Sequence, residues 1–299
     1  MNSRLGLLNP LNWALWIKFL VGIAIGLIIL AVPAYLYMRE NIFELGEQNA
    51  LAFVTQLGVK QASAVNNALV QARTALDNFT ENADNERMII GYLLRNVRTD
   101  TQTYLPDVSN EQIAEVFRSG LINPAAASFD SVRLLNRSGE MVVNVNAASA
   151  SFERQDDTQS TAFREIQTAQ LQGQSSLIAI SQGTTTSVVE LVETIFWRDG
   201  SPLGYVVTVM NNTRNFSNNL RLDDTPANYS AYSFLTTTQG GLIAPSAVRE
   251  RALNASSSPI VENALAGQSG AATYSASDGL EYIGYSTPLG GTPFVLVTQ

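Results

Sequence analysis

Side chains able to carry acid–base, nucleophilic or metal chemistry are scarce in this sequence. It contains no histidine and no cysteine, so the commonest general base, the thiol nucleophile and the preferred zinc ligands are missing. No glycine-rich phosphate loop lies between a predicted strand and a predicted helix. The residue types therefore argue against an enzyme, with a hydrolase that uses carboxylates alone as the one catalytic alternative.

The other candidates for chemistry are carboxylates. Asp156–Asp157 and Asp223–Asp224 are acidic pairs of the kind that bind hard cations. Both lie in polar stretches predicted to be loops, where neighbouring carboxylates are usually solvated. Glu190 and Glu193 are three residues apart on a predicted strand, so they point to opposite faces and cannot form an acid–base pair. We therefore predict no catalytic residues, no bound metal and no cofactor.

An uncharged apolar run from Phe19 to Tyr37 fixes where the rest of the chain can lie. A helix of this length crosses a bilayer core of about 30 Å. Arg4 and Lys18 precede the run and acidic residues follow it from Glu40 onwards. This order favours a cytoplasmic N-terminus and a body outside the cytoplasm. A cleaved signal peptide is the alternative, and the length of the run favours an uncleaved anchor.

The rest of the chain is polar and acidic. Without Arg4 and Lys18 it has 16 basic and 26 acidic residues, a net charge of −10. Such a body binds nucleic acid poorly and is repelled by an anionic membrane surface.

Within the apolar run, Gly22 and Gly26 have the spacing found in membrane helices that pack closely against each other. This spacing favours a homodimer.

A long helix is predicted after the apolar run, within residues 39–98. Small and apolar residues recur at alternating spacings of four and three, which places them on one stripe of a helix. They are Leu51, Thr55, Gly58, Ala62, Val65, Leu69, Ala72, Leu76 and Phe79. A helix from Glu40 to about Glu81 would be roughly 60 Å long, with a break at 82–85 before a second piece. The stripe faces either a dimer partner or the body's own sheets.

Beyond Pro106 the hydrophobic period changes from helical to alternating. Ser109 and Gln112 form a capping box that opens a short helix. Strands are predicted at 129–135 and 140–146, then a helix at 161–171, then strands at 176–181, 187–197 and 203–210. A connecting helix is predicted at 212–220.

The chain then repeats this order on a smaller scale. Residues 233–243 echo the first hairpin, residues 259–267 echo the helix closed by Gly173, and residues 288–298 echo 202–209. A repeat of this kind implies two similar modules in series. Each would be an antiparallel sheet with helices packed on it, so the predicted fold class is α+β.

The closing phrases of the two modules are distinctive. GSPLGYVVTV at 200–209 and GLEYIGYSTPLGGTPFVLV at 279–297, together with the order of span, long helix and two sheet modules, resemble the double Cache sensor domains of bacterial transmembrane receptors. The resemblance covers about 39–299. It implies PAS-like modules stacked along one helix, in chemoreceptors, sensor histidine kinases or nucleotide cyclases. The divisions are 1–18 cytoplasmic, 19–38 transmembrane helix, 39–98 stalk helix, 99–222 membrane-distal module and 223–299 membrane-proximal module.

In this family the distal module usually holds a small-molecule ligand, between its sheet and a covering helix. The corresponding candidate contacts here are Arg154, Phe163, Arg164, Thr185, Glu190 and Phe196. Surface charge or ordinary core packing is the alternative role of each. Amino-acid-binding members have an Arg followed closely by Trp and Tyr. The matching stretch, Thr161–Glu165, lacks the aromatic pair, which argues against an amino-acid ligand, although Arg164 could meet an anionic group.

The resemblance implies the extracytoplasmic sensing part of a membrane-anchored receptor, with signal passed along the long helix of a homodimer. Family members continue into a second span and an output domain. Because this chain stops at Gln299, we expect it to be the sensor half of a longer receptor. If Gln299 is the natural end, a membrane-anchored binding or assembly protein without signalling output is the better account.

Overall fold

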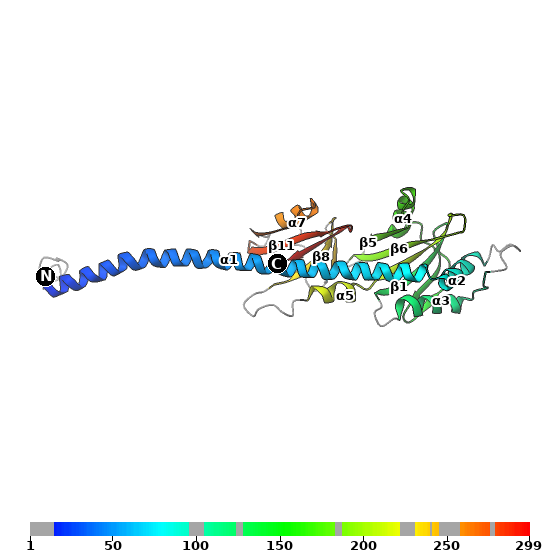
Figure 1. Ribbon diagram of the computed structural model, residues 1–299, viewed down its shortest axis with the longest axis horizontal. Coiled ribbons are helices and arrows are strands. Elements are labelled where there is room, and N and C mark those ends of the chain that lie inside the picture. The colour runs from blue at the N-terminus through cyan, green and yellow to red at the C-terminus, as the bar shows by residue number, and fades with distance from the viewer. Residues whose placement is uncertain are drawn as a thin grey trace, which may run out of the picture. The chain divides into compact units, whose positions relative to one another are not determined.

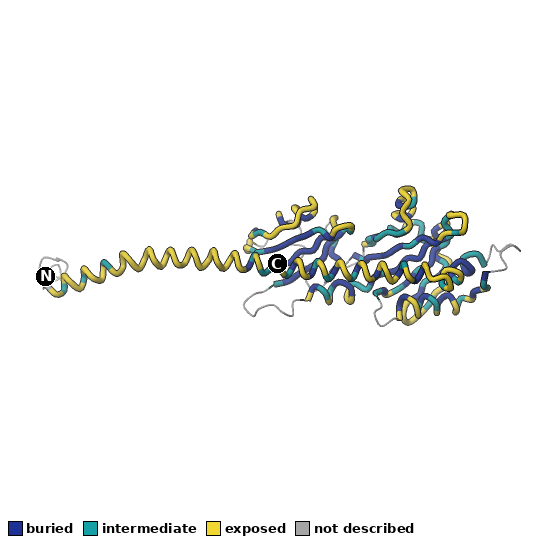
Figure 2. Tube along the Cα trace, in the orientation of Figure 1, coloured by how far each residue is buried: buried dark blue, intermediate teal, exposed yellow. Residues whose placement is uncertain are grey.

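The computed structural model describes residues 15–95, 105–123, 128–182, 187–221, 231–239, 241–244, 258–275 and 279–299. The chain divides into two compact units, Met1–Phe53 and Val54–Gln299. Helix α1 (Leu15–Thr80) begins in the first unit and ends in the second. In the first unit its apolar side chains are largely exposed (Figure 2). Among the described helices, α1 alone is long and apolar enough to cross a membrane.

The second unit contains two antiparallel sheets, each with a helix on one face (Figure 1). The larger sheet has β1 (Phe129–Asn136), β2 (Glu140–Asn146), β3 (Ala150–Ser151), β4 (Gln155–Asp156), β5 (Ser176–Ser181), β6 (Val188–Phe196) and β7 (Pro202–Met210). The smaller sheet has β8 (Ser233–Thr237), β9 (Leu242–Ala244), β10 (Gly270–Ser275), β11 (Glu281–Leu289) and β12 (Phe294–Thr298). The covering helices are α4 (Thr161–Leu171) and α7 (Pro259–Leu265). The predicted α+β class is confirmed.

The two sheets have the same connectivity. The larger sheet runs β2-β1-β7-β6-β5 and the smaller runs β9-β8-β12-β11-β10, and in each the helix follows the first hairpin. The larger sheet adds only the two-residue strands β3 and β4 beside β2. The internal repeat in the sequence therefore corresponds to a repeated structural unit. We call the two units the larger module and the smaller module.

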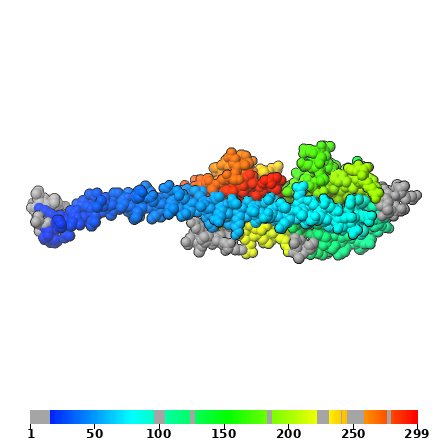
Figure 3. Space-filling model, in the orientation of Figure 1, coloured from blue at the N-terminus to red at the C-terminus, as the bar shows by residue number. Residues whose placement is uncertain are grey.

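From Val54 onwards, α1 lies along both sheets (Figure 3). Its stripe from Val65 to Phe79 is buried in one core that also contains strand residues of both modules. Nearer its start in this unit, the Gln61 side chain accepts hydrogen bonds from Ser233 Oγ at 2.7 Å and Thr298 Oγ1 at 3.0 Å. The sequence predicted that the stripe faces either a dimer partner or the body's own sheets. In the second unit the stripe packs on the sheets.

Two shorter helices follow α1 and cover the same face of the larger sheet. α2 (Ala83–Leu94) begins after Asn82, whose side chain accepts from the Asp84 and Asn85 amides. α3 (Asn110–Phe117) opens with the predicted capping box and runs into a short π-helical turn, η4 (Arg118–Ile122). The long helical region therefore contains a break at residues 81–82, where the cap starts a new helix.

The modules are joined by a short helical connection, α5 (Asn212–Asn215) and η5 (Ser217–Leu220). The Asn212 side-chain Nδ2 donates to the carbonyls of Ser187 and Ile243, at 3.0 and 3.4 Å. The Ser187 amide donates to the Leu242 carbonyl at 2.7 Å. These bonds, with the Phe216 and Phe294 rings 6.3 Å apart, tie the smaller sheet to the larger one.

Candidate functional site

The α4 side of the larger sheet contains a charged cluster beside an otherwise apolar layer. Strand residues alternate between the two faces, so Glu190 and Glu193 of β6 point to opposite faces as predicted, Glu190 toward the α4 side and Glu193 toward α1. Leu135, Val192 and Tyr205 pack under α4 in a core separate from the one under α1. A charged group on this inner face therefore needs partners close by.

Local sequence places α4 over the sheet. Ser160 caps the helix by accepting from the Phe163 amide at 3.2 Å. The apolar stripe of α4 then faces the strands, and the Phe163 ring meets the Tyr205 ring edge-on at 5.5 Å. Gly139 has a φ of +85° and lies against the Phe163 ring, so a side chain there would be both strained and obstructed. The helix is thus held against the β1–β2 turn.

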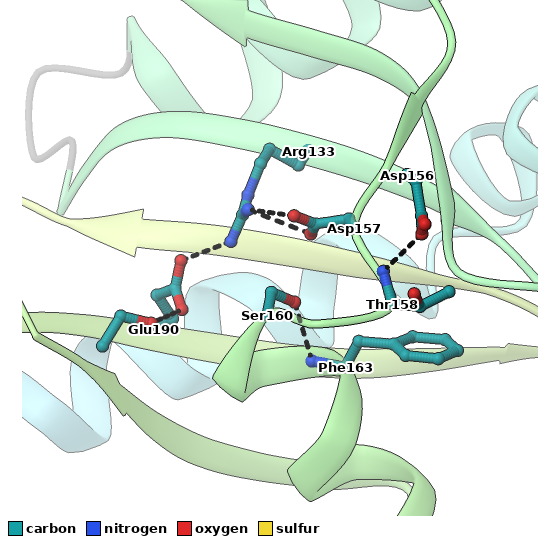
Figure 4. A network of polar contacts seen from close by, with 8 residues as sticks. Arg133, Asp156, Asp157, Thr158, Ser160, Phe163 and Glu190 are labelled. Carbon is teal, nitrogen blue, oxygen red and sulfur yellow. Dashed lines mark hydrogen bonds and ion pairs between the residues drawn. The ribbon is translucent and has the colours of Figure 1, made fainter.

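Arg133 of β1 is the centre of the charged cluster (Figure 4). Its Nη1 donates to both carboxylate oxygens of Asp157, at 3.0 and 3.2 Å. Its Nη2 donates to Glu190 Oε1, while the other Glu190 oxygen accepts from Ser181 Oγ at 2.7 Å. We call Arg133, Asp157, Ser181 and Glu190 the Arg133 network. Glu190 is only 4% exposed, so its charge depends on these bonds.

The register of the sheet brings the network together. Arg133 pairs with Val207 of β7, and Val207 pairs with Val192 of β6. Glu190 is two residues from Val192 on the same face, so the guanidinium reaches diagonally across β7. Asp157 comes from the other direction, in the loop between β4 and α4. Three separate chain segments thus meet around one guanidinium.

The network carries more negative than positive charge. One guanidinium faces two carboxylates, and Glu165 of α4 is close enough to be affected by the charge of Glu190. Burial raises the pKa of Glu165, and the Glu190 charge raises it further. Arg133 Nε is buried and finds no partner among the described residues. A charged group of a bound solute could therefore take the place of one network member, pairing with Arg133 instead of a carboxylate or with a carboxylate instead of Arg133.

The structure brings together some of the residues predicted from the sequence as ligand contacts and separates others. Glu190 and Phe163 are both on the side of the sheet that α4 covers, Glu190 on β6 within the Arg133 network and Phe163 on α4 in the apolar core. Arg164 is exposed on the outer side of α4. Phe196 is at the end of β6 and 39% exposed. Thr185 lies outside the described residues, as do Asp223 and Asp224.

Arg154 has a different setting. It lies after β3, ion-paired with Glu140 at 3.7 Å, and faces a cavity formed with α2 and the β1–β2 turn. The cavity is lined by residues outside the Arg133 network. Arg154 and Glu190 therefore belong to two separate places in the larger module.

Sequence reasoning missed Arg133 and Ser181 and read Asp157 only as half of an acidic pair. The available signal was a charged residue inside a strongly apolar strand, between Val132 and Leu134. That signal alone does not separate an inward arginine from a solvated one, because alternate residues of a half-exposed strand are commonly polar. The partner Glu190 is 57 residues away.

Comparison with protein-family models and with curated proteins found no match. Solved structures of similar fold do exist. An extracellular domain assigned to a histidine kinase, rpHK1S-Z16, aligns with a TM-score of 0.56 at 14% identity, over 83% of this chain and 92% of that one. The periplasmic sensory domain of the Campylobacter jejuni chemoreceptor Tlp1 gives 0.54 at 12% identity, over 86% and 95%.

A third match is the ligand-binding domain of the Pseudomonas aeruginosa amino-acid chemoreceptor PctC in complex with GABA. It aligns with a TM-score of 0.50 at 16% identity, over 83% of this chain and 97% of that one. At such identities the likeness concerns the fold, and it extends over both modules and the long helix. The chain therefore has the fold of the double Cache domains that form the extracytoplasmic sensing parts of bacterial receptors.

Proposed function

We propose that this chain is the extracytoplasmic solute-sensing part of a membrane-anchored receptor, with its ligand bound at the Arg133 network. The apolar part of α1 anchors the protein with a cytoplasmic N-terminus, and the larger module is the membrane-distal one. The response passes along α1 in a homodimer. The fold supports a sensing role, and the network supports the position of the site.

The single observation that carries the site is the composition of the sheet face under α4. Leu135, Val192 and Tyr205 make most of this face apolar, yet Arg133 and Glu190 are held there with little exposure. Burying an ion pair is costly compared with burying apolar side chains of similar volume. A face that keeps such charges under a covering helix is suited to binding a charged solute.

The excess of carboxylates favours a solute that carries a cationic group, such as a primary amine. An ammonium group brought between Asp157 and Glu190 would share these carboxylates with Arg133 and balance the excess negative charge. With a zwitterionic solute, the Arg133 guanidinium would also hold the carboxylate of that solute. The site therefore suits amines and zwitterions better than simple anions, although the sequence of α4 lacks the aromatic pair of amino-acid-binding family members.

The continuity of α1 supports the proposed relay. The helix that contains the apolar segment also contains the stripe packed on both modules. The relay requires two arrangements of the larger module that pack differently under α1. A ligand shifts the balance between them only as far as its affinities for the two arrangements differ.

The test is a thermal-shift screen of the full chain in nanodiscs with primary amines, diamines and amino acids. A solute at about one hundred times its Kd should add about 2.7 kcal/mol of stability, or about 5–10 °C for a body of this size. Asp157→Asn should weaken the apparent affinity for the solute at least about tenfold, because it removes one charge-assisted hydrogen bond. The thermal shift at a given solute concentration should therefore be smaller.

Asp199→Asn is the matched control, since Asp199 is an exposed turn residue away from the network. It should leave the shift unchanged. A screen in which no amine, diamine or amino acid raises the melting temperature would contradict direct sensing of such solutes. A hit that Asp157→Asn leaves intact would place the ligand elsewhere.

A further inference from the structure

The cavity beside Arg154 lies in the larger module, at the end of the sheet where the β1–β2 turn meets the last turn of α2. Its volume is about 580 Å³, within the range of small-molecule pockets, which is about 300–1,000 Å³. Its walls come from α2, the β1–β2 turn, the segment after β3 and the start of β7. None of the four residues of the Arg133 network lines it.

The inner wall of the cavity is apolar and aromatic. Tyr92 is buried, and its hydroxyl bonds to Asn110 Oδ1 at 3.0 Å. Leu93 and Leu203 pack against the core beside it, and Phe152 closes the other side. The Leu93 side chain lies against Gly204, where a β-carbon would collide with it and with a carbonyl of β1. This wall is therefore a fixed part of the module.

The outer wall carries three guanidinium groups, from Arg95, Arg137 and Arg154. Arg95 stacks on the Tyr92 ring, 4.1 Å from its centroid, and donates to Asn110 Oδ1 at 2.6 Å. These contacts fix its position and leave its charge without a carboxylate partner among the described residues. Burial raises the pKa of Tyr92, and the charges of Arg95 and Arg154 oppose that rise.

The other two arginines are weakly neutralised. Arg154 is 58% exposed and approaches Glu140 only to 3.7 Å, and an exposed pair at this distance contributes little. Among the described residues Arg137 has no hydrogen bond or ion pair, and its charge acts on Asp199 only as the smallest of the effects that lower the pKa of that carboxyl. In a chain with a net charge of −8, three arginines around one cavity concentrate positive charge there. Guanidinium groups bind carboxylate and phosphate in bidentate geometry.

We propose that this cavity is a second ligand site, for a small organic anion with a carboxylate or phosphate group on an apolar body. The anionic group would lie between Arg137 and Arg154, and the body would rest on Tyr92, Phe152 and Leu203. Apolar walls with a few convergent charged groups are the usual composition of such sites. A diffuse positive surface would attract any anion, whereas this cavity selects anions that also have an apolar part.

The test is isothermal titration calorimetry on the full chain in nanodiscs made only of phosphatidylcholine. The probes are phthalate, phenyl phosphate, inorganic phosphate and the neutral compound phthalamide. Phthalate or phenyl phosphate should bind, with the tighter of the two identifying the anionic group. Inorganic phosphate and phthalamide should bind at least about tenfold more weakly, because each lacks one of the two contacts.

Arg137→Gln and Arg154→Gln should each weaken the tighter probe about tenfold or more. Both side chains are exposed, so these variants should keep the melting temperature of the parent. Arg164 is also exposed, on the outer side of α4, so Arg164→Gln is the matched control and should bind the probe unchanged. Asp157→Asn should also leave it unchanged, which separates this site from the Arg133 network.

Three results would overturn the proposal. They are the absence of binding by both aromatic anions, equal binding of inorganic phosphate and the aromatic anions, and equal weakening by Arg164→Gln and Arg137→Gln. Each would mean that the cavity either stays empty or acts only through general surface charge. Failure here would leave the amine screen at the Arg133 network unaffected.

Discussion

Glu193 should make the stability of this protein fall as the pH rises from acid to neutral. Its carboxyl lies on the α1 side of β6, and one of its oxygens is buried without a hydrogen-bond partner among the described residues. Burial, the largest cause, acts together with the Asp77 and Glu81 charges to raise its pKa from the ordinary 4.5 to about 7, while Arg73 and Ser176 oppose the rise.

The sign follows from proton binding. Between pH 4.5 and about 7 the folded protein holds a proton on Glu193 that the unfolded chain has released. Stability therefore decreases as pH rises through this window, and the decrease is complete above pH 7. The raised pKa corresponds to about 3 kcal/mol against the charged form. Because the carboxylate is partly exposed and screened, we expect about 1–2 kcal/mol.

Glu193→Gln removes this charge and supplies an amide that can stay buried. At pH 8 the variant should melt about 2–8 °C above the parent, from about 2–4 °C per kcal/mol for a body of this size. Well below pH 4.5, where both states of the parent are protonated, the two proteins should melt within about 1 °C of each other. The assay is thermal unfolding of the full chain in nanodiscs across this pH range.

Glu281→Gln is the matched control, because Glu281 is exposed at the start of β11, and it should change neither end of the profile. Arg73→Gln should act in the opposite direction and lower the melting temperature at pH 8, since Arg73 is the cation that offsets the Glu193 charge. An equal stabilisation by Glu193→Gln at pH 4.5 and pH 8 would refute the reasoning, because it would not depend on ionisation.

Two further predictions concern packing. Gly58→Ala would place a β-carbon too close to the edge of the Tyr285 ring, so it should cost about 1–3 kcal/mol in urea unfolding despite a gain in helix propensity. Gly46→Ala, at an open position of the same helix, should cost nothing, and equal effects of the two would contradict the predicted collision. Phe294→Ala should cost about 3–5 kcal/mol, because Phe294 is fully buried against Phe216 between the modules; a loss below about 1 kcal/mol would show that this contact does not hold them together.

Much of the fold could be predicted because its signals are local. The stripe on α1, the capping box at Ser109 and the alternation of the strands each need only a short window of sequence. The predicted strand 187–197 is Val188–Phe196 in the structure, and the predicted strand 203–210 is Pro202–Met210. The internal repeat also predicted two similar modules in series, because the same pattern of strands and helix occurs twice. Sequence did not indicate β3 and β4, which have two residues each.

The candidate sites could be predicted only in part. Glu190 was identified as a polar residue on a wall strand, and Arg154 as a cation near the covering segment. Whether two of these residues share a site depends on how β1, β7 and β6 lie side by side. The sequence of a single strand does not reveal that order. Arg154 belongs with Arg137 around a cavity, whereas Glu190 belongs with Arg133.

The sequence by itself determined the apolar span, the long amphipathic helix, the twofold repeat and the alternation that sends Glu190 and Glu193 to opposite faces. These are properties of neighbouring residues, set by backbone period and burial. Only the tertiary structure decided that the stripe of the second unit packs on its own sheets. It also decided that Arg133 reaches Glu190 across β7, and that three arginines surround one cavity. Such meetings depend on strand order and register, because the side chains involved are far apart in the chain and adjacent only after folding.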